Sequence, residues 1–103
     1  MKIYSWKPEA DGSYSGDLLI TLLEGQGYSC STYHYPPGTF FPAHDHANDK
    51  IDGVISGEFQ ICMDGESVIL HAGEYIHVPA GTKHTARVLG TVPVISVDAV
   101  KTG

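Results

Sequence analysis

The chain has 103 residues, of which 42% are hydrophobic and 17% are charged, a composition typical of one globular domain and not of a disordered segment. Its formal net charge of -6 argues against partners such as nucleic acid or an anionic membrane surface, because both require a basic face. The first residues lack the apolar core of a signal peptide, and no apolar run approaches the roughly 18 residues of a membrane span. We therefore expect a cytoplasmic protein with one domain over residues 1–103.

The N-terminal part of the chain is interpreted as an arm that leads into the domain. Residues 1–15 are the arm, with a short strand near residues 2–5 and then a loop. Residues 17–25 (DLLITLLEG) are rich in leucine, but the segment is short and flanked by glycine, so a strand or a single helical turn fits equally well. No convincing helix is predicted anywhere in the chain.

The remaining sequence predicts a series of short strands. Twelve glycines and six prolines indicate frequent tight turns, among them Pro36-Pro37-Gly38 and Asp64-Gly65. Turn signals at intervals of roughly ten residues are typical of an all-β sandwich or barrel. The strands are expected over residues 27–35, 40–46, 50–55, 58–63, 67–70, 75–78, 84–89 and 94–100.

Three histidines are candidate metal ligands. His44 and His46 are one residue apart, and residues i and i+2 of a β-strand point to the same face, so both imidazoles are aimed into one space. The segment GEYIHVPAGTKH over residues 73–84 adds His84 after a Pro-x-Gly turn. If His84 meets the other two, the three side chains form a site of the kind that binds transition metals.

The spacing of these residues resembles the two-part signature of the cupin superfamily. The family's first motif is G-x5-H-x-H-x3,4-E-x6-G, and residues 38–57 match it at Gly38, His44, His46 and Gly57. Its second motif is G-x5-P-x-G-x2-H-x3-N, and residues 73–88 match it from Gly73 through Pro79 and Gly81 to His84. The resemblance implies an all-β double-stranded β-helix, the jelly-roll barrel. It also implies one divalent transition metal (Fe, Ni, Zn, Mn or Cu) on the three histidines.

Two motif positions differ from the family pattern. Val88 stands at the asparagine position, and Lys50 stands at the position of the glutamate that is usually the fourth ligand. Three-histidine cupins exist, including thiol dioxygenases and a diketone-cleaving dioxygenase, so the metal site is retained in the prediction. Three protein ligands leave open positions for water or substrate, as in catalytic sites.

Lys50 can be interpreted in three ways. In a regular strand Lys50, Asp52 and Val54 share the inward face, so Asp52 or the inward Asp98 of the last strand can pair with the ammonium. Alternatively, Lys50 binds the carboxylate of an anionic substrate. In the third interpretation Lys50 replaces the charge of the metal, and the pocket is metal-free. The second is slightly preferred.

The functional prediction is a metal-dependent enzyme that acts on a small anionic substrate, a carboxylate or an enolate. Lys50, Asp52 and Asp98 are the candidate catalytic residues, and His34 is a further acid–base candidate by strand parity. Some small cupins that open uronate rings carry an acidic residue in a V-x-D sequence, which VISVDAV around Asp98 resembles. The reaction is therefore either dioxygenase-like or a sugar-acid ring-opening or isomerisation. The alternative is a non-catalytic ligand-binding or metal-binding module with a vestigial site.

The resemblance also carries an expectation about assembly. Small cupins with an N-terminal arm commonly exchange edge strands across a two-fold axis, which removes exposed sheet edges. A homodimer is therefore expected, with Tyr4 and Trp6 of the arm buried on the partner's sheet. The aromatic residues predicted to form the core and the pocket wall are Tyr33, Tyr35, Phe40, Phe41 and Tyr75.

Overall fold

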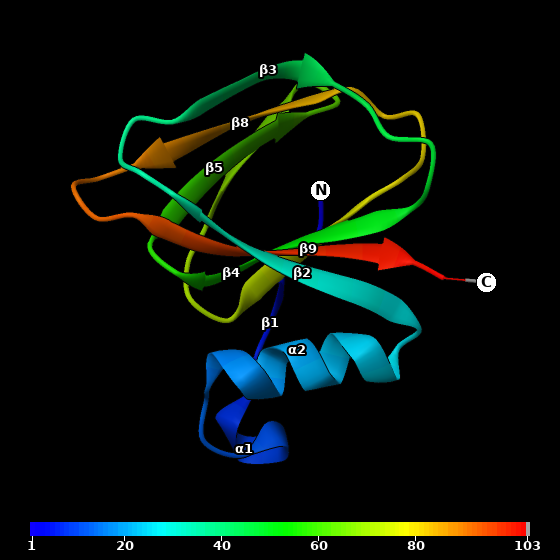
Figure 1. Cartoon of the computed structure of the whole chain (residues 1–103), viewed down its shortest axis with the longest axis vertical. Helices are drawn as coiled ribbons and strands as arrows, with labels where there is room; N and C mark the ends of the chain where they lie inside the picture. Colours follow the sequence, from blue (N-terminus) through cyan, green and yellow to red (C-terminus); the bar gives the residue numbers. More distant parts are fainter. Residues whose placement is uncertain (103) are drawn as a thin grey trace.

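A computed structural model describes residues 1–102 of the chain, and its strands form two antiparallel sheets that face each other (Figure 1). The five-stranded sheet has the order β1-β7-β4-β9-β2, and the four-stranded sheet has the order β3-β8-β5-β6. This is the predicted all-β jelly roll. The strands are β1 (Tyr4–Ser5), β2 (Tyr28–Tyr35), β3 (Phe40–His44), β4 (Lys50–Ser56), β5 (Glu58–Met63), β6 (Glu66–Leu70), β7 (Glu74–Val78), β8 (His84–Leu89) and β9 (Val94–Lys101).

The main core lies between the two sheets and follows from the alternation of the strands. In β5, Phe59, Ile61 and Met63 are buried while the residues between them are more exposed, as expected for a strand with one face on the core. The turn after β4 requires glycine, because Gly57 has φ of +92° and a Cβ atom there would lie 2.6 Å from the Pro93 carbonyl oxygen. The core residues are Val54, Phe59, Ile61, Met63, Leu70, Ile76, Val78, Ala86, Val88 and Val94.

The leucine-rich segment is a helix, so the prediction of a strand or a single turn, and of no convincing helix, is wrong. Helix α2 (Gly16–Gly25) begins at Ser15, whose side chain accepts a hydrogen bond from the Leu18 N–H. Leu19 and Leu23, four residues apart, are both fully buried and pack on the outer face of the five-stranded sheet. Of the two flanking glycines, Gly16 permits close packing, since a Cβ atom there would lie 2.6 Å from the Ile55 side chain.

The N-terminal arm packs on the sheet of its own chain. Tyr4 pairs with Tyr75 of β7, and their rings are stacked with centroids 5.5 Å apart. The Trp6 backbone N–H donates to the Gly73 carbonyl at 2.8 Å. In the structure Tyr4 and Trp6 pack on the sheet of their own chain, and their exchange onto a partner's sheet stays a prediction. A short helix, α1 (Pro8–Asp11), stands in the predicted loop.

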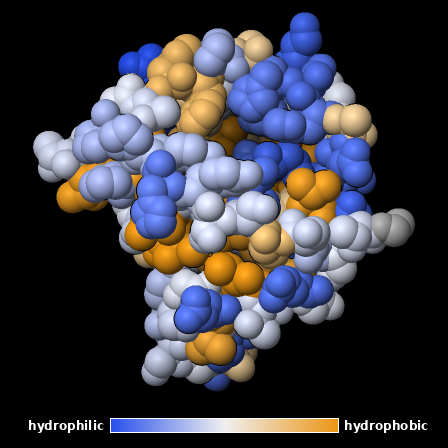
Figure 2. All heavy atoms as spheres, viewed as in Figure 1, coloured by the Kyte–Doolittle hydropathy of each residue, from blue (hydrophilic) through white to orange (hydrophobic). Residues whose placement is uncertain are grey.

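The face shown in Figure 2 carries interspersed hydrophilic and hydrophobic residues. Helix α2 lies below the sheets in Figure 1 and covers the outer face of the five-stranded sheet. Strand β4 is consequently buried on both faces, with Ile51 towards the helix and Val54 in the main core. Neither helix found in residues 1–102 has the length and apolar character needed to cross a membrane.

Candidate metal centre

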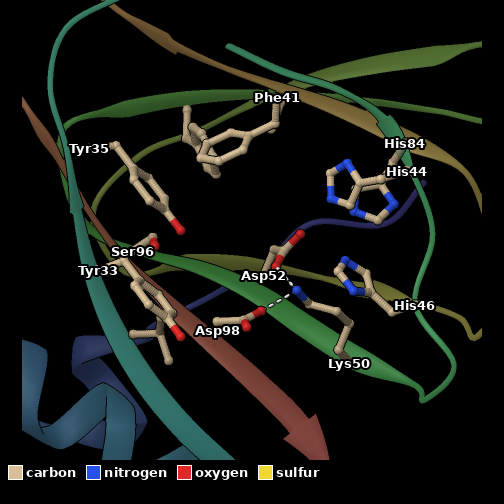
Figure 3. Close-up of a pocket in the computed structure, with 13 residues that line it drawn as sticks. Tyr33, Tyr35, Phe41, His44, His46, Lys50, Asp52, His84, Ser96 and Asp98 are labelled. Carbon is tan, nitrogen blue, oxygen red and sulfur yellow. Dashed lines mark ion pairs between the residues drawn. The ribbon is translucent and has the colours of Figure 1, made fainter. Parts of the chain in front are cut away.

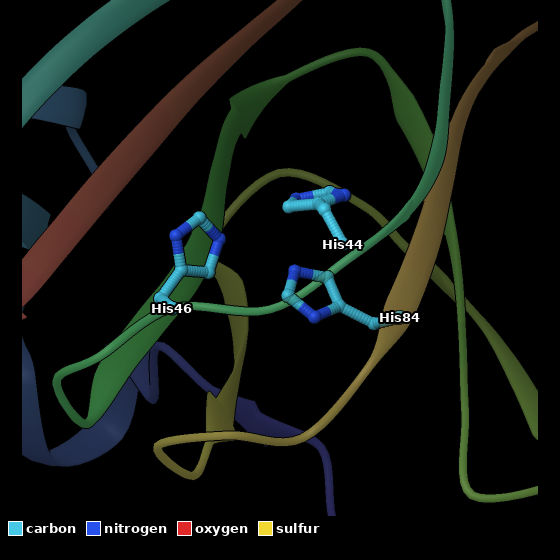
Figure 4. Close-up of side chains that lie close together, drawn as sticks. All are labelled: His44, His46 and His84. Atoms are coloured by element: carbon cyan, nitrogen blue, oxygen red, sulfur yellow. The ribbon is translucent and has the colours of Figure 1, made fainter.

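The three candidate ligands meet at one end of the space between the sheets (Figure 4). His44 ends β3 and is directly paired with His84, the first residue of β8, while His46 follows in the connection to β4. The ring centroids are 4.3 Å apart for His44 and His84, 5.0 Å for His44 and His46, and 5.2 Å for His46 and His84. One nitrogen from each ring lies within 4.8 Å of those of the others.

Backbone carbonyls fix the orientation of two of the rings. His44 Nδ1 lies 2.7 Å from the Pro42 carbonyl oxygen, and His84 Nδ1 lies 3.0 Å from the Thr82 carbonyl oxygen. An oxygen that only accepts requires Nδ1–H as the donor, so Nε2 is left as the free lone pair on each ring. This is the outer hydrogen bonding that metal-bound histidines typically make.

His46 provides the strongest sign that the site fits a metal. Its Nε2 atom is buried and has no hydrogen-bond partner among the described residues, and such an orphan is costly unless a ligand satisfies it. Burial, reinforced by the Lys50 ammonium, lowers the pKa of the His46 imidazole below its usual value. The ring is therefore held neutral, as coordination requires. Three neutral imidazoles suit Fe, Ni, Cu and Zn, and Mn less strongly.

A β-bulge in β3 brings a further residue to the site. Phe41 and His44 both line the pocket although they are three positions apart in the sequence, a spacing that places residues on opposite faces of a regular strand. The register of β3 against β8 shifts between these two residues, and the irregularity turns the strand so that both point inward.

Lys50, Asp52 and Asp98 form a partly buried ionic cluster beside the histidines (Figure 3). Lys50 Nζ lies 3.1 Å from Asp52 Oδ1 and also contacts Asp98 Oδ1. The side chains are 7%, 15% and 30% exposed for Lys50, Asp52 and Asp98. Burial opposes the charge on Lys50, but the two carboxylates outweigh it and raise the pKa of its ammonium above the usual value.

The strand register explains why this cluster exists. Asp52 of β4 and Asp98 of β9 are direct cross-strand partners, and like charges in that arrangement repel each other. Lys50, two residues before Asp52 on the same face, lies between the two carboxylates and neutralises the repulsion. Of the three interpretations of Lys50, the structure therefore favours ion pairing with Asp52 and Asp98. The Lys50 ammonium is already paired and is not free to bind a substrate carboxylate.

The histidines and the ionic cluster line one pocket of about 200 Å³. Tyr33, Tyr35 and Phe41 line it, and Tyr75 is buried in the core between the sheet and helix α2, as predicted. Phe40 differs from the prediction, because it is exposed outside the pocket with its ring against Arg87. Ser96 was missed by the sequence reasoning, although its position two residues before Asp98 on β9 is a signal that would have found it. The lining residues are Tyr33, Tyr35, Phe41, His44, His46, Lys50, Asp52, Phe59, His84, Ala86, Ser96, Val97 and Asp98.

His34 is not part of the site. It is exposed on β2 between Tyr33 and Tyr35, both of which line the pocket, so its side chain points to the opposite face. The prediction of His34 as an acid–base candidate facing the cavity is therefore wrong. The strand was assigned correctly, but the parity of this segment was not fixed by its sequence.

The fold and the site together define a small double-stranded β-barrel with a three-histidine centre. The model of the cupin domain family (Cupin_2) matches residues 31–100, and the chain belongs to this family. The predicted resemblance is confirmed.

The chain matches a different share of the length of each relative. The chain is 37% identical over 81 residues to quercetin 2,3-dioxygenase of Bacillus subtilis, a match that covers 76% of this chain and 21% of that protein. The chain thus spans about a fifth of that relative. A cupin protein from Bacteroides fragilis has a crystal structure with a TM-score of 0.62 and 31% identity, over 75% of this chain and 68% of that one. The DMSP lyase DddQ of Ruegeria pomeroyi has a TM-score of 0.66 and 22% identity, over 74% and 39% of the two chains, and shows the fold alone.

Proposed function

We propose that the protein is a metal-dependent enzyme that acts on a small anionic substrate, a carboxylate or an enolate. The observation that carries the proposal is the buried, unpartnered Nε2 of His46 beside two histidines whose Nδ1 atoms are already engaged. His44, His46 and His84 are the proposed ligands. When bound, a divalent transition metal supplies Lewis acidity and, if it is iron or copper, redox chemistry with dioxygen.

The charge balance of the pocket supports an anionic substrate by a route that the sequence did not indicate. Lys50 carries one positive charge and the two aspartates carry two negative charges, so the cluster has a net charge of -1. With neutral histidines, a divalent ion would change the net charge of the pocket to +1. A monoanion would complete the neutralisation in a site where unbalanced charge is costly.

The ionic cluster is proposed to move protons. Asp52 and Asp98 are the candidate general bases, and Lys50 positions both carboxylates. This equipment suits two reaction classes: oxygenation of an enolate or carboxylate, and proton transfer with ring opening or isomerisation of a sugar acid. The dioxygenase named among the relatives supports the first.

Metal analysis is the direct test of this proposal. The untagged protein, purified without chelators, is examined by mass spectrometry beside His46→Ala and the matched control His34→Ala, whose histidine is exposed outside the pocket. We expect near-stoichiometric metal in the wild type and in His34→Ala, and its loss in His46→Ala. Absence of metal from all three proteins, even after reconstitution with each candidate ion, would refute the proposal.

A non-catalytic binding module is the second candidate function. The observation in its favour is that Lys50, at the position of the usual fourth ligand, is already paired with two carboxylates without any ligand. A protein that binds no metal, yet retains a stable pocket, would support this alternative. Homodimeric assembly and a cytoplasmic location remain part of the proposal, and size-exclusion chromatography with light scattering tests the first of them.

A further inference from the structure

The pocket has an aromatic wall opposite its charged groups. We define this wall as Tyr33, Tyr35, Phe41 and Phe59. The Tyr35 ring meets Phe41 edge-on at 4.8 Å and Phe59 at 5.9 Å, and Phe41 meets Phe59 edge-on at 6.3 Å. Tyr33 is stacked on Tyr35 with centroids 6.0 Å apart and planes 5° from parallel. Because Tyr33 is 45% exposed, the wall extends from the interior to the surface.

The wall offers few hydrogen bonds to a ligand. The polar atoms of the wall are the Tyr33 and Tyr35 hydroxyls, of which the Tyr35 hydroxyl lies beside the Ser96 side chain, and Phe41 and Phe59 have no polar atoms. Figure 3 shows Ser96 beside the Tyr35 hydroxyl, with Phe41 above them and the histidines at the other end. A hydroxyl-rich ligand would bury its hydroxyl groups against these rings without partners, which is unfavourable. A planar ring would instead stack or pack edge-on.

The size of the pocket limits the ligand further. Its volume of about 200 Å³ is below the range of roughly 300–1,000 Å³ that is usual for drug-sized ligands. The volume therefore suits a molecule of about one ring and a substituent.

We propose that the pocket takes a small planar monoanion: one aromatic ring, or a conjugated enol of similar size, that carries a single acidic group. The flat part lies on the aromatic wall, and the acidic group faces the three histidines and the metal proposed there. This inference rests on the proposed function for its charge. It selects between the two reaction classes, because it favours a planar enolate or aromatic acid over a polyhydroxylated sugar acid.

The test measures binding, not turnover. Wild-type protein loaded with cobalt(II) is titrated with benzoate, cyclohexanecarboxylate and threonate, and the visible cobalt bands report binding. The three probes are monoanions with equal numbers of heavy atoms; cyclohexanecarboxylate lacks planarity, and threonate replaces the ring by hydroxyl groups. We expect benzoate to bind about fivefold more tightly than cyclohexanecarboxylate and about tenfold more tightly than threonate. Equal affinities, or a preference for threonate, would overturn the inference.

Matched variants connect the preference to the wall. Phe41→Leu should reduce the benzoate preference, whereas Phe40→Leu should retain it, because the neighbouring Phe40 lies outside the pocket against Arg87. Tyr35→Phe should retain it as well, since the ring remains. Circular dichroism melting confirms that each variant is folded. If Phe40→Leu and Phe41→Leu behave alike, the wall does not select the ligand.

A metal-free experiment separates this inference from the proposed function. If cobalt does not bind the wild type, the proposed function fails, and the neutral probes phenol and cyclohexanol are titrated instead, with the ring protons of Phe41 and Tyr35 followed by NMR. Tighter binding of phenol that is lost in Phe41→Leu still supports the aromatic wall as a ligand surface. Equal binding of the two alcohols overturns it.

Discussion

Removal of the Lys50 charge is the most informative perturbation of this pocket. Lys50→Met keeps most of the side-chain volume but leaves Asp52 and Asp98 facing each other as unpaired carboxylates. Breaking a buried ion pair by removal of one partner costs about 3–5 kcal/mol. Because Asp98 is 30% exposed, water screens part of its charge, and we expect the lower end, about 3 kcal/mol.

Thermal unfolding followed by circular dichroism measures this effect, after dialysis against a chelator so that no bound metal contributes. A change of 3 kcal/mol corresponds to a fall in Tm of about 12–24 °C for a domain of this size. The matched control is Lys7→Met, which removes an exposed lysine and should change Tm by little. Adding Asp98→Asn to Lys50→Met removes one unpaired carboxylate and should restore part of the lost stability.

If Lys50→Met melts within a few degrees of the wild type and of Lys7→Met, Lys50 does not hold the two aspartates together, and the cluster carries no stabilising charge. A double variant that is less stable than Lys50→Met would likewise contradict the like-charge repulsion between Asp52 and Asp98.

Three further perturbations test other parts of the structure. The difference in unfolding free energy between wild type and Lys50→Met should persist up to pH 10.5, the ordinary pKa of lysine. It should shrink as the pH rises through the higher folded-state pKa of Lys50, because only the protonated ammonium stabilises the folded state. Chemical denaturation at a series of pH values measures this difference. Leu23→Ala should cost about 2–5 kcal/mol, since Leu23 is fully buried under the sheet, whereas Leu18→Ala, at a side chain that is 46% exposed, should be nearly neutral in the same urea titrations. Gly57→Ala should reduce Tm by more than about 4–8 °C, which is the effect of 1 kcal/mol. The reason is that the φ of Gly57 is +92° and an added Cβ atom would lie 2.6 Å from the Pro93 carbonyl oxygen. An unchanged Tm would show that the turn relaxes.

The barrel and the three histidines were predictable because their signals are local. The Gly57 turn and the alternation in β5 depend on residues close together in the chain, where backbone conformation and parity act directly. His44 and His46 belong to one local motif, although β3 ends at His44, so that strand parity does not itself place His46. His84 was found from a second local motif, and its pairing with His44 follows from the barrel itself.

The remaining features depend on contacts that spacing alone does not encode. The bulge before His44 changes which residues of β3 face inward, and parity counting has no means to detect it. Helix α2 is stabilised by packing on the outer face of the sheet, through Leu19 and Leu23 against Ile51, so its short, glycine-flanked sequence gave an ambiguous signal. The register of β4 against β9, which sets Asp52 opposite Asp98, joins segments that are distant in the sequence.

That register changes what the lysine at the glutamate position means. A glutamate at residue 50 would bring one negative charge to the histidines, whereas this chain has two carboxylates beside them and a lysine that binds both. The pocket thereby keeps its negative charge, and the two carboxylates that carry this charge are held in place by ion pairs to Lys50. A carboxylate in that position can accept a proton from a bound substrate, which a metal-coordinated carboxylate does less readily. We therefore interpret Lys50 as a positioning residue, and Asp52 and Asp98 are the first candidates for the proton acceptor.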